Sequence, residues 1–214
     1  MPGIDAFEKY PEEYDQWFDT HPELYAAELK VLRRLLPSSS EARGLEVGVG
    51  SGKFAVPLGI GNGVDPSEKM AAKARLQGVD VLSGVAENLP FADAGFDFVL
   101  MVTTICFVDD IKQSLAEARR VLKSNGFIVV GFVDKDSALG REYSAKKHRS
   151  RFYRDATFLS APEVLNYLET SGFSVAEVLQ AIVPGESPDL ILDGFGTGSF
   201  VAIRATKNKL QTQV

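Results

Sequence analysis

Short apolar runs separated by helical segments constrain the fold of this chain most. Residues 96–102 (FDFVLMV) and 127–133 (FIVVGFV) form the continuous apolar runs that strands buried on both faces require. An amphipathic helical pattern at 109–123 lies between them. Earlier strand-like segments likewise alternate with helical ones. This alternation predicts right-handed βαβ crossovers and an α/β fold with a doubly wound, mostly parallel sheet.

Other segments flank the predicted sheet. Residues 5–36 read as helical, with Pro22 in the first turn of a second helix that Pro37 ends, followed by a serine loop at 38–40. A capping box precedes a later helix. Two late strands then follow.

Composition excludes several classes of function. The chain of 214 residues is 45% hydrophobic and 24% charged, as in ordinary globular proteins. It has no apolar run of about 18 residues and no secretory pattern at its N-terminus, which predicts a cytoplasmic protein without a membrane partner. One cysteine and two histidines favour neither a disulfide framework nor a metal site. The net charge of −6 argues against nucleic-acid binding.

A glycine-rich loop follows the first predicted strand at residues 46–52 (EVGVGSG). Its alternating glycines allow a sharp turn and a close ligand approach, and we expect them to present free N–H groups to an anion. A phosphate loop is excluded because Val47 and Phe54 occupy positions that require Gly and Ser or Thr. Residues 50–55 do match the dinucleotide fingerprint, although the expected acid about 20 residues further on comes early, at Asp65. A nicotinamide-dependent oxidoreductase therefore stays an alternative.

The pattern E-x-G-x-G-x-G resembles the first motif of class I S-adenosylmethionine-dependent methyltransferases. Three further segments resemble later motifs of that family in the same order, at 63–67 (GVDPS), 86–99 (AENLPF and FDFV) and 120–126 (RVLKSNG). The resemblance is strongest over residues 40–134. Val85 departs from it, because many relatives carry Asp there.

The resemblance implies a Rossmann-like fold and S-adenosyl-L-methionine as cofactor, with S-adenosyl-L-homocysteine as product. It assigns Glu46 to the methionine end of the cofactor, Asp65 to the ribose hydroxyls and Ala86 with Glu87 to the adenine. The full set of expected cofactor-binding residues is Glu46, Gly48, Gly50, Gly52, Asp65, Pro66, Ser67, Met70, Ala86, Glu87 and Thr103. Each has a structural alternative, such as a cap for Glu46 or a turn for Asp65. A non-catalytic cofactor-binding protein also stays open.

No catalytic signature is required, because methyl transfer depends mainly on alignment of the reacting atoms. Aromatic residues near the N-terminus and in the later basic stretch are expected to close over the site. The substrate or cap candidates are Tyr14, Trp17, Phe18, Cys106, His148, Phe152 and Tyr153. An exposed position for His148 and a buried one for Cys106 are the alternatives to a chemical role. The basic residues between 141 and 154 suggest a small acceptor, including an anionic one, rather than protein or nucleic acid.

These expectations combine into a single domain over residues 1–214. Its predicted parts are a helical cap at 1–37, a cofactor-binding core at 40–134, a lid-like insertion at 135–160 and a C-terminal helix with strands at 161–206.

Overall fold

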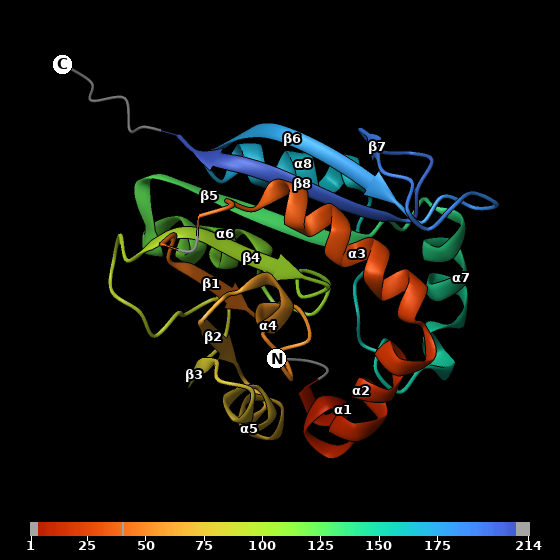
Figure 1. Cartoon of the computed structure of the whole chain (residues 1–214), viewed down its shortest axis with the longest axis horizontal. Helices are drawn as coiled ribbons and strands as arrows, with labels where there is room; N and C mark the ends of the chain where they lie inside the picture. The colour runs from red at the N-terminus through yellow and green to blue at the C-terminus, as the bar shows by residue number, and fades with distance from the viewer. Residues whose placement is uncertain (1–3, 40, 209–214) are drawn as a thin grey trace.

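The computed structural model describes residues 4–39 and 41–208 (Figure 1). Ser40 of the predicted serine loop lies outside the described residues, as do the first three and last six residues of the predicted domain. Among the described helices, none has the length and apolar character needed to cross a membrane.

The strands alternate with helices through the first two thirds of the chain. The strands are β1 (Gly44–Val47), β2 (Asn62–Asp65), β3 (Asp80–Ser83), β4 (Phe96–Val102), β5 (Leu122–Val133), β6 (Phe173–Ala181), β7 (Leu192–Asp193) and β8 (Phe200–Lys207). The helices are α1 (Ile4–Lys9), α2 (Pro11–Thr20), α3 (Pro22–Leu35), α4 (Ala55–Leu58), α5 (Glu68–Leu76), α6 (Ile111–Val121), α7 (Ala138–Lys146), the 3-10 helix η1 (Lys147–Arg149) and α8 (Ala161–Thr170).

The strands form one sheet in the order β3-β2-β1-β4-β5-β8-β6-β7. Strands β1 to β5 pair in parallel, whereas β8 runs antiparallel to both β5 and β6, and β7 runs antiparallel to β6. Helices α6 and α8 cover one face, and α3, α4 and α5 cover the other (Figure 1). The predicted doubly wound, mostly parallel α/β fold is confirmed.

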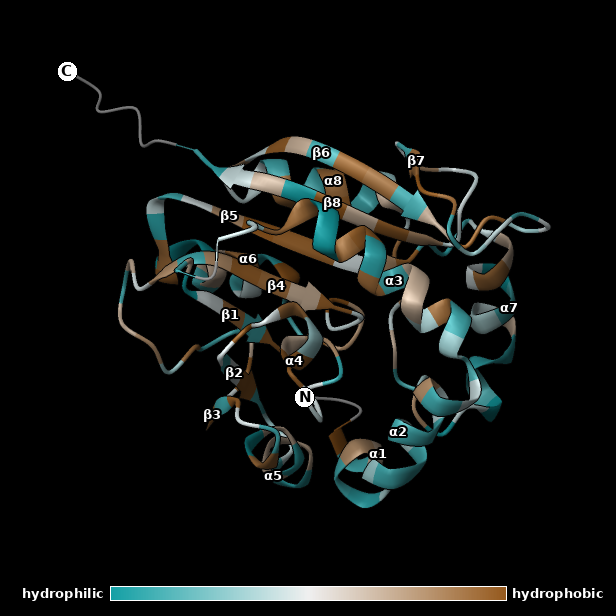
Figure 2. Ribbon diagram, in the orientation of Figure 1, coloured by the Kyte–Doolittle hydropathy of each residue, from teal (hydrophilic) through white to brown (hydrophobic). Residues whose placement is uncertain are grey.

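Strand β4 shows why the central strands are apolar throughout. Val99 and Met101 pack in the hydrophobic cluster under α6 and α8, while Leu100 and Val102 pack in the opposite cluster under α3. Both faces of this strand are therefore buried, as the apolar run predicts. Figure 2 shows the same apolar character along β4 and β5.

Side-chain caps fix several helix starts. Ser67 caps α5, and Asp110 caps α6. Ser160 and Glu163 form the predicted capping box of α8, in which the Ser160 N–H donates to Glu163 Oε2 over 2.7 Å.

The end of α6 differs from the prediction. The helical pattern extends to residue 123, but α6 ends at Val121, and β5 begins at Leu122 and includes the Ser-Asn-Gly segment at 124–126. Leu122 pairs with Phe96 of β4, and the next pair joins Phe98 to Phe127. The segment therefore forms a bulge within β5, because four residues on one strand face a single residue on the other.

The N-terminal helices divide into two groups. Helix α3 packs on the sheet, where Val31 and Leu32 are fully buried. Helices α1 and α2 instead lie near the carboxyl ends of the parallel strands, beside α7 (Figure 1). Glu8 of α1 accepts from Ser67 Oγ at 2.6 Å, which ties α1 to the start of α5.

Candidate active site

The glycine loop between β1 and α4 turns tightly against β2. Gly50 has φ +55°, a conformation that favours glycine, and a Cβ there would lie 3.4 Å from Met70 Cε. The Gly48 N–H donates to Val64 O, that of Gly50 to Asp65 Oδ2 and that of Gly52 to Val49 O. The expectation of free glycine N–H groups for an anion is therefore wrong. The loop offers an open backbone surface instead.

A cavity of about 780 Å³, partly open to solvent, lies between this loop, the ends of β2 and β4, and α1 and α2. We call it the loop cavity. It lies at the carboxyl ends of the parallel strands, where ligands bind in open α/β sheets. Ten of the predicted residues line it, namely Tyr14, Gly48, Gly50, Asp65, Pro66, Ser67, Met70, Ala86, Thr103 and Tyr153.

Asp65 ends β2 with its carboxylate at the cavity wall, and its residue surface is 7% exposed. Its Oδ2 accepts from the Gly50 N–H and its Oδ1 from the Ser67 N–H, both at 2.8 Å. Burial raises the pKa of Asp65 to about 6, although these two N–H groups oppose the increase. Because a carboxylate oxygen has two acceptor positions, both oxygens can still accept from a ligand hydroxyl.

Glu46 lies beneath the loop and does not line the loop cavity. It is 1% exposed, and its Oε2 has no hydrogen-bond partner among the described residues. Burial raises the pKa of Glu46 well above its usual range, and the nearby Asp65 charge adds to the increase. A buried acceptor without a partner is costly, so this oxygen is suited to a ligand ammonium or hydroxyl.

Gly52 and Glu87 also lie outside the loop cavity. A Cβ on Gly52 would lie 3.4 Å from Ala74 Cβ, so this glycine allows close packing on α5. Glu87 Oε1 accepts from the Asp109 N–H at 2.7 Å, which turns this side chain toward the start of α6.

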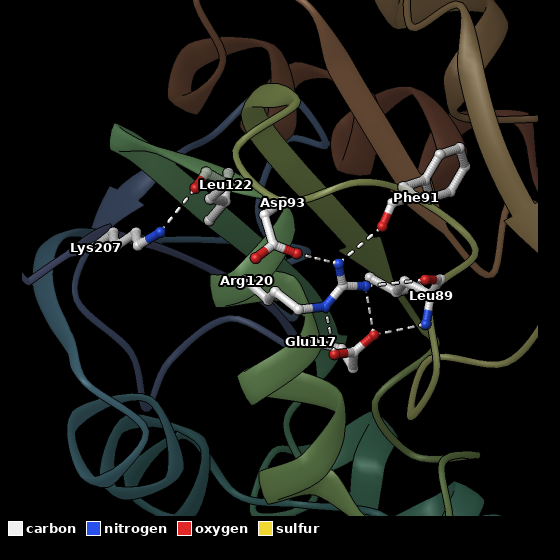
Figure 3. A network of polar contacts seen from close by, with 7 residues as sticks. All are labelled: Leu89, Phe91, Asp93, Glu117, Arg120, Leu122 and Lys207. Carbon is white, nitrogen blue, oxygen red and sulfur yellow. Dashed lines mark hydrogen bonds and ion pairs between the residues drawn. The ribbon is translucent and has the colours of Figure 1, made fainter.

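An arginine network holds the segment after β3 in place (Figure 3). Arg120 of α6 donates to Leu89 O at 3.0 Å and to Phe91 O at 2.8 Å. It also forms ion pairs of 2.7 Å with Asp93 and Glu117. Two motifs noted in the sequence, 86–91 and 120–126, are thus joined physically, and this contact holds the segment that places Ala86 at the cavity wall.

A second cavity of about 740 Å³, also partly open to solvent, lies beside the loop cavity. Its aromatic residues are Tyr14, Trp17, Phe18, Phe54, Tyr143, Phe152 and Tyr153, and we call it the aromatic cavity. Tyr14, Thr103 and Tyr153 line both cavities. The two predicted aromatic segments do meet here, since the Tyr14 and Phe152 ring centroids are 5.8 Å apart.

Thr103 occupies a strained position at the shared wall. It follows β4 with φ +50°, which is rare for a β-branched residue. Its N–H donates to Gly131 O at 2.8 Å, a contact that holds the backbone in place. Ile182, which lines the aromatic cavity, has φ +59°. Such strain is concentrated at functional sites in proteins.

The carboxyl groups among the described lining residues of the aromatic cavity belong to two glutamates, Glu13 and Glu28. Arg151 pairs with Glu13 at 2.7 and 2.8 Å. Glu28 is 5% exposed and has no hydrogen bond or ion pair among the described residues. Burial raises its pKa to about 8.

Aromatic residues of the predicted lid line the cavities, but none of its described Lys and Arg side chains does. Lys146 pairs with Glu142 at 2.7 Å, and Lys147 Nζ donates to Ala156 O at 3.0 Å. The guanidinium of Arg151 lies 3.9 Å from the Tyr10 ring centroid. These contacts satisfy the three basic groups locally, and an anionic acceptor stays a prediction from the sequence.

Two candidates for a chemical role lie outside both cavities. His148 is exposed on η1, where its Nε2 contacts Arg149 Nε at 3.2 Å. Cys106 is buried, its Sγ donates to Thr103 O at 3.2 Å, and burial raises its pKa to about 12. A thiol that stays protonated is a poor nucleophile or base.

Sequence reasoning missed Glu28, Phe54 and Tyr143. One signal for Glu28 was available, because it falls on the apolar face of α3 at helical spacing with Val31, Leu32 and Leu35. A charged residue within a buried stripe indicates either a partner or a ligand. Tyr143 carried no comparable signal, because its position depends on how α7 packs.

Known proteins resemble this chain over nearly its whole length. A family model described as a methyltransferase domain matches residues 45–130. An uncharacterised protein of Methanocaldococcus jannaschii is 44% identical over 95% of this chain and 100% of its own length. The malonyl-[acyl-carrier protein] O-methyltransferase of Geobacter sulfurreducens is 29% identical over 86% of this chain and 74% of its own length.

One crystal structure is similar in both sequence and fold. It comes from Thermotoga maritima and is described as a SAM-dependent methyltransferase, possible histamine N-methyltransferase. It is 48% identical to this chain, has a TM-score of 0.90, and the match covers 95% of this chain and 99% of the other. This likeness decides against the nicotinamide-dependent oxidoreductase, and the chain belongs to the class I S-adenosylmethionine-dependent methyltransferases.

Proposed function

We propose that this enzyme methylates a small molecule bound in the aromatic cavity, using S-adenosylmethionine bound in the loop cavity. The shared wall of Tyr14, Thr103 and Tyr153 is the observation that carries the proposal. In-line methyl transfer requires the acceptor atom and the methyl carbon to be adjacent and aligned. Two neighbouring cavities with shared lining residues would place the two ligands next to each other.

The residues of the loop cavity fit the cofactor. The Asp65 carboxylate would accept hydrogen bonds from the ribose hydroxyls. Glu46 lies outside the cavity lining, beneath the loop, and its unpartnered Oε2 would accept from the ammonium of the methionine end. Gly50 leaves room for the ligand, while Met70 and Ala86 supply apolar contact for the adenine. The bound cofactor supplies an activated methyl group on a sulfonium. The protein contributes binding, alignment and exclusion of water.

The aromatic cavity supports a small acceptor. It is concave and lined mainly by aromatic and aliphatic side chains, as small-molecule pockets are. Its walls come from α2, α3, α7 and the segment around Tyr153, which enclose it on several sides. The sequence also predicts that the protein does not bind nucleic acid and that it is cytoplasmic, and both stay predictions.

A cavity-filling substitution tests this assignment. Leu139 of α7 lines the aromatic cavity, so Leu139→Trp should abolish transfer to small nucleophiles while leaving S-adenosylhomocysteine binding unchanged. Leu76→Trp is the matched control, because Leu76 is exposed on α5. Release of S-adenosylhomocysteine would be measured with amines, phenols, thiols and carboxylates. Histamine belongs in the screen because the description of the T. maritima relative names it.

We expect the native protein to transfer a methyl group to at least one small molecule. Leu139→Trp should lose this activity, and Leu76→Trp should retain it. Full activity of Leu139→Trp, or transfer to protein or nucleic acid alone, would contradict the proposal.

A further inference from the structure

Among the described residues that line the aromatic cavity, Glu28 is the acidic side chain that has no counter-ion. It lies on the buried face of α3, is 5% exposed and borders the cavity. It has no hydrogen bond or ion pair among the described residues. A carboxyl group this deeply buried without a partner is costly to retain in a fold. Its position therefore points to a partner that arrives through the cavity.

The other titratable groups at this cavity do not compensate Glu28. Glu13 of α2 is paired with Arg151. Burial raises the pKa values of Tyr14 on α2, Tyr143 on α7 and Tyr153 above the usual tyrosine range, so all three are neutral near pH 7. Among the described lining residues there is no Lys, Arg or His.

The remaining walls suit a cation with an apolar body. Trp17, Phe18 and Phe54 line the cavity together with Tyr143 and Phe152. Aromatic rings attract cations through their faces and also bury apolar groups. An anion would find no basic side chain to pair with among the described lining residues.

We infer that the acceptor is a small primary or secondary amine carrying an apolar or aromatic group, and that Glu28 binds its ammonium. This inference rests on the proposed function, since it names the substrate class of the same cavity. Methylation forms a bond between the amine nitrogen and the methyl carbon as the bond from that carbon to the sulfonium sulfur breaks. The bound ammonium first releases one proton to solvent, which frees the nitrogen lone pair for the new bond, and the sulfur keeps the electron pair of the bond that breaks.

Calorimetric titration tests the assignment in the presence of saturating S-adenosylhomocysteine. The probes are 2-phenylethylamine and histamine, with 2-phenylethanol as the neutral analogue and phenylacetate as the anionic one. The variants are Glu28→Gln, which keeps the side-chain shape, and Glu23→Gln, which makes the same change at an exposed position of α3. Titrating in two buffers of different ionisation enthalpy also gives the number of protons released on binding.

We expect an amine to bind the native protein at least tenfold more tightly than the alcohol or the acid. Glu28→Gln should weaken amine binding by about ten- to a hundredfold, the usual loss for a charged hydrogen bond, and leave S-adenosylhomocysteine affinity unchanged. Proton release near pH 7 should accompany amine binding and disappear in Glu28→Gln, because the free carboxyl must ionise to pair with the ammonium. Glu23→Gln should behave like the native protein.

The inference would be overturned if the native protein bound amine and alcohol equally, preferred the acid, or bound neither amine. Unchanged amine affinity in Glu28→Gln would overturn it as well. The native-protein comparison needs no variant, so it decides the matter even if Glu28→Gln folds poorly. Methylation of a neutral or anionic small molecule that Leu139→Trp abolishes would leave the proposed function standing without this inference. Absence of transfer to small molecules of every charge would instead reject the proposed function.

Discussion

Replacing Glu28 by Gln should change how the stability of the ligand-free protein depends on pH. Burial raises the pKa of this carboxyl from 4.5 to about 8 in the folded protein, so the folded state holds a proton that the unfolded state releases. Stability from this proton is fully present below about pH 4.5 and is lost as pH rises toward 8. The glutamine variant has no such titration.

The magnitude follows from the two pKa values. Their difference of about 3.5, at about 1.4 kcal/mol for each unit, gives at most about 5 kcal/mol between the two pH limits. Over the practical range of pH 5 to 8 the expected change is about 4 kcal/mol. Asp65 also titrates near pH 6, but it does so in both proteins and cancels in the comparison.

Urea unfolding of the native protein, Glu28→Gln and Glu23→Gln at several pH values gives the required free energies. The native protein should lose stability relative to Glu28→Gln as pH rises, while Glu23→Gln should stay parallel to the native protein. A native-minus-Glu28→Gln difference that is constant from pH 5 to 8 would refute the reasoning. It would mean that Glu28 ionises normally in the folded protein, through water or a partner.

Three further predictions concern the loop cavity. Asp65→Ala should weaken S-adenosylmethionine affinity by about ten- to a hundredfold, measured by calorimetry, with the exposed Asp80→Ala unchanged; equal affinities would reject the ribose role. Gly50→Val should prevent cofactor binding. Gly59→Val should retain it, because Gly59 has a similar φ of +71° but its Cβ would have no atom within 4 Å. Cofactor binding by both variants would mean that the ligand does not lie against Gly50. The native protein should bind the cofactor less tightly below pH 6, by up to about tenfold per pH unit, because the Asp65 carboxylate must then lose a proton first; an equal slope in Asp65→Asn would contradict this.

The sequence predicted those parts of the site that lie close together in the chain. The glycine loop and Asp65 end neighbouring parallel strands, so their local motifs determine that they meet. Ser67 and the Ser160 capping box were also predictable, because caps depend on residues a few positions apart. The apolar run of β4 likewise indicated burial on both faces.

Other features depend on distant packing and could not be predicted this way. The roles of Glu28 and Tyr143 follow from how α3 and α7 pack around one cavity. Glu87 matched a family motif, yet its carboxylate accepts from the backbone N–H of Asp109 and so points toward the start of α6 rather than into the loop cavity. The basic stretch suggested a cationic lid, but a count of charges does not reveal partners such as Glu13 for Arg151.

Methyl transfer to matched acceptors tests the central claim most directly. The enzyme would be incubated with methyl-deuterated S-adenosylmethionine and an equimolar mixture of an arylalkylamine, its alcohol analogue and its carboxylate analogue. Mass spectrometry of the products would identify the labelled atom. The account predicts that the amine nitrogen gains the labelled methyl group with stoichiometric formation of S-adenosylhomocysteine. Labelling of the alcohol or carboxylate in preference to the amine, or of none of the three, would contradict it.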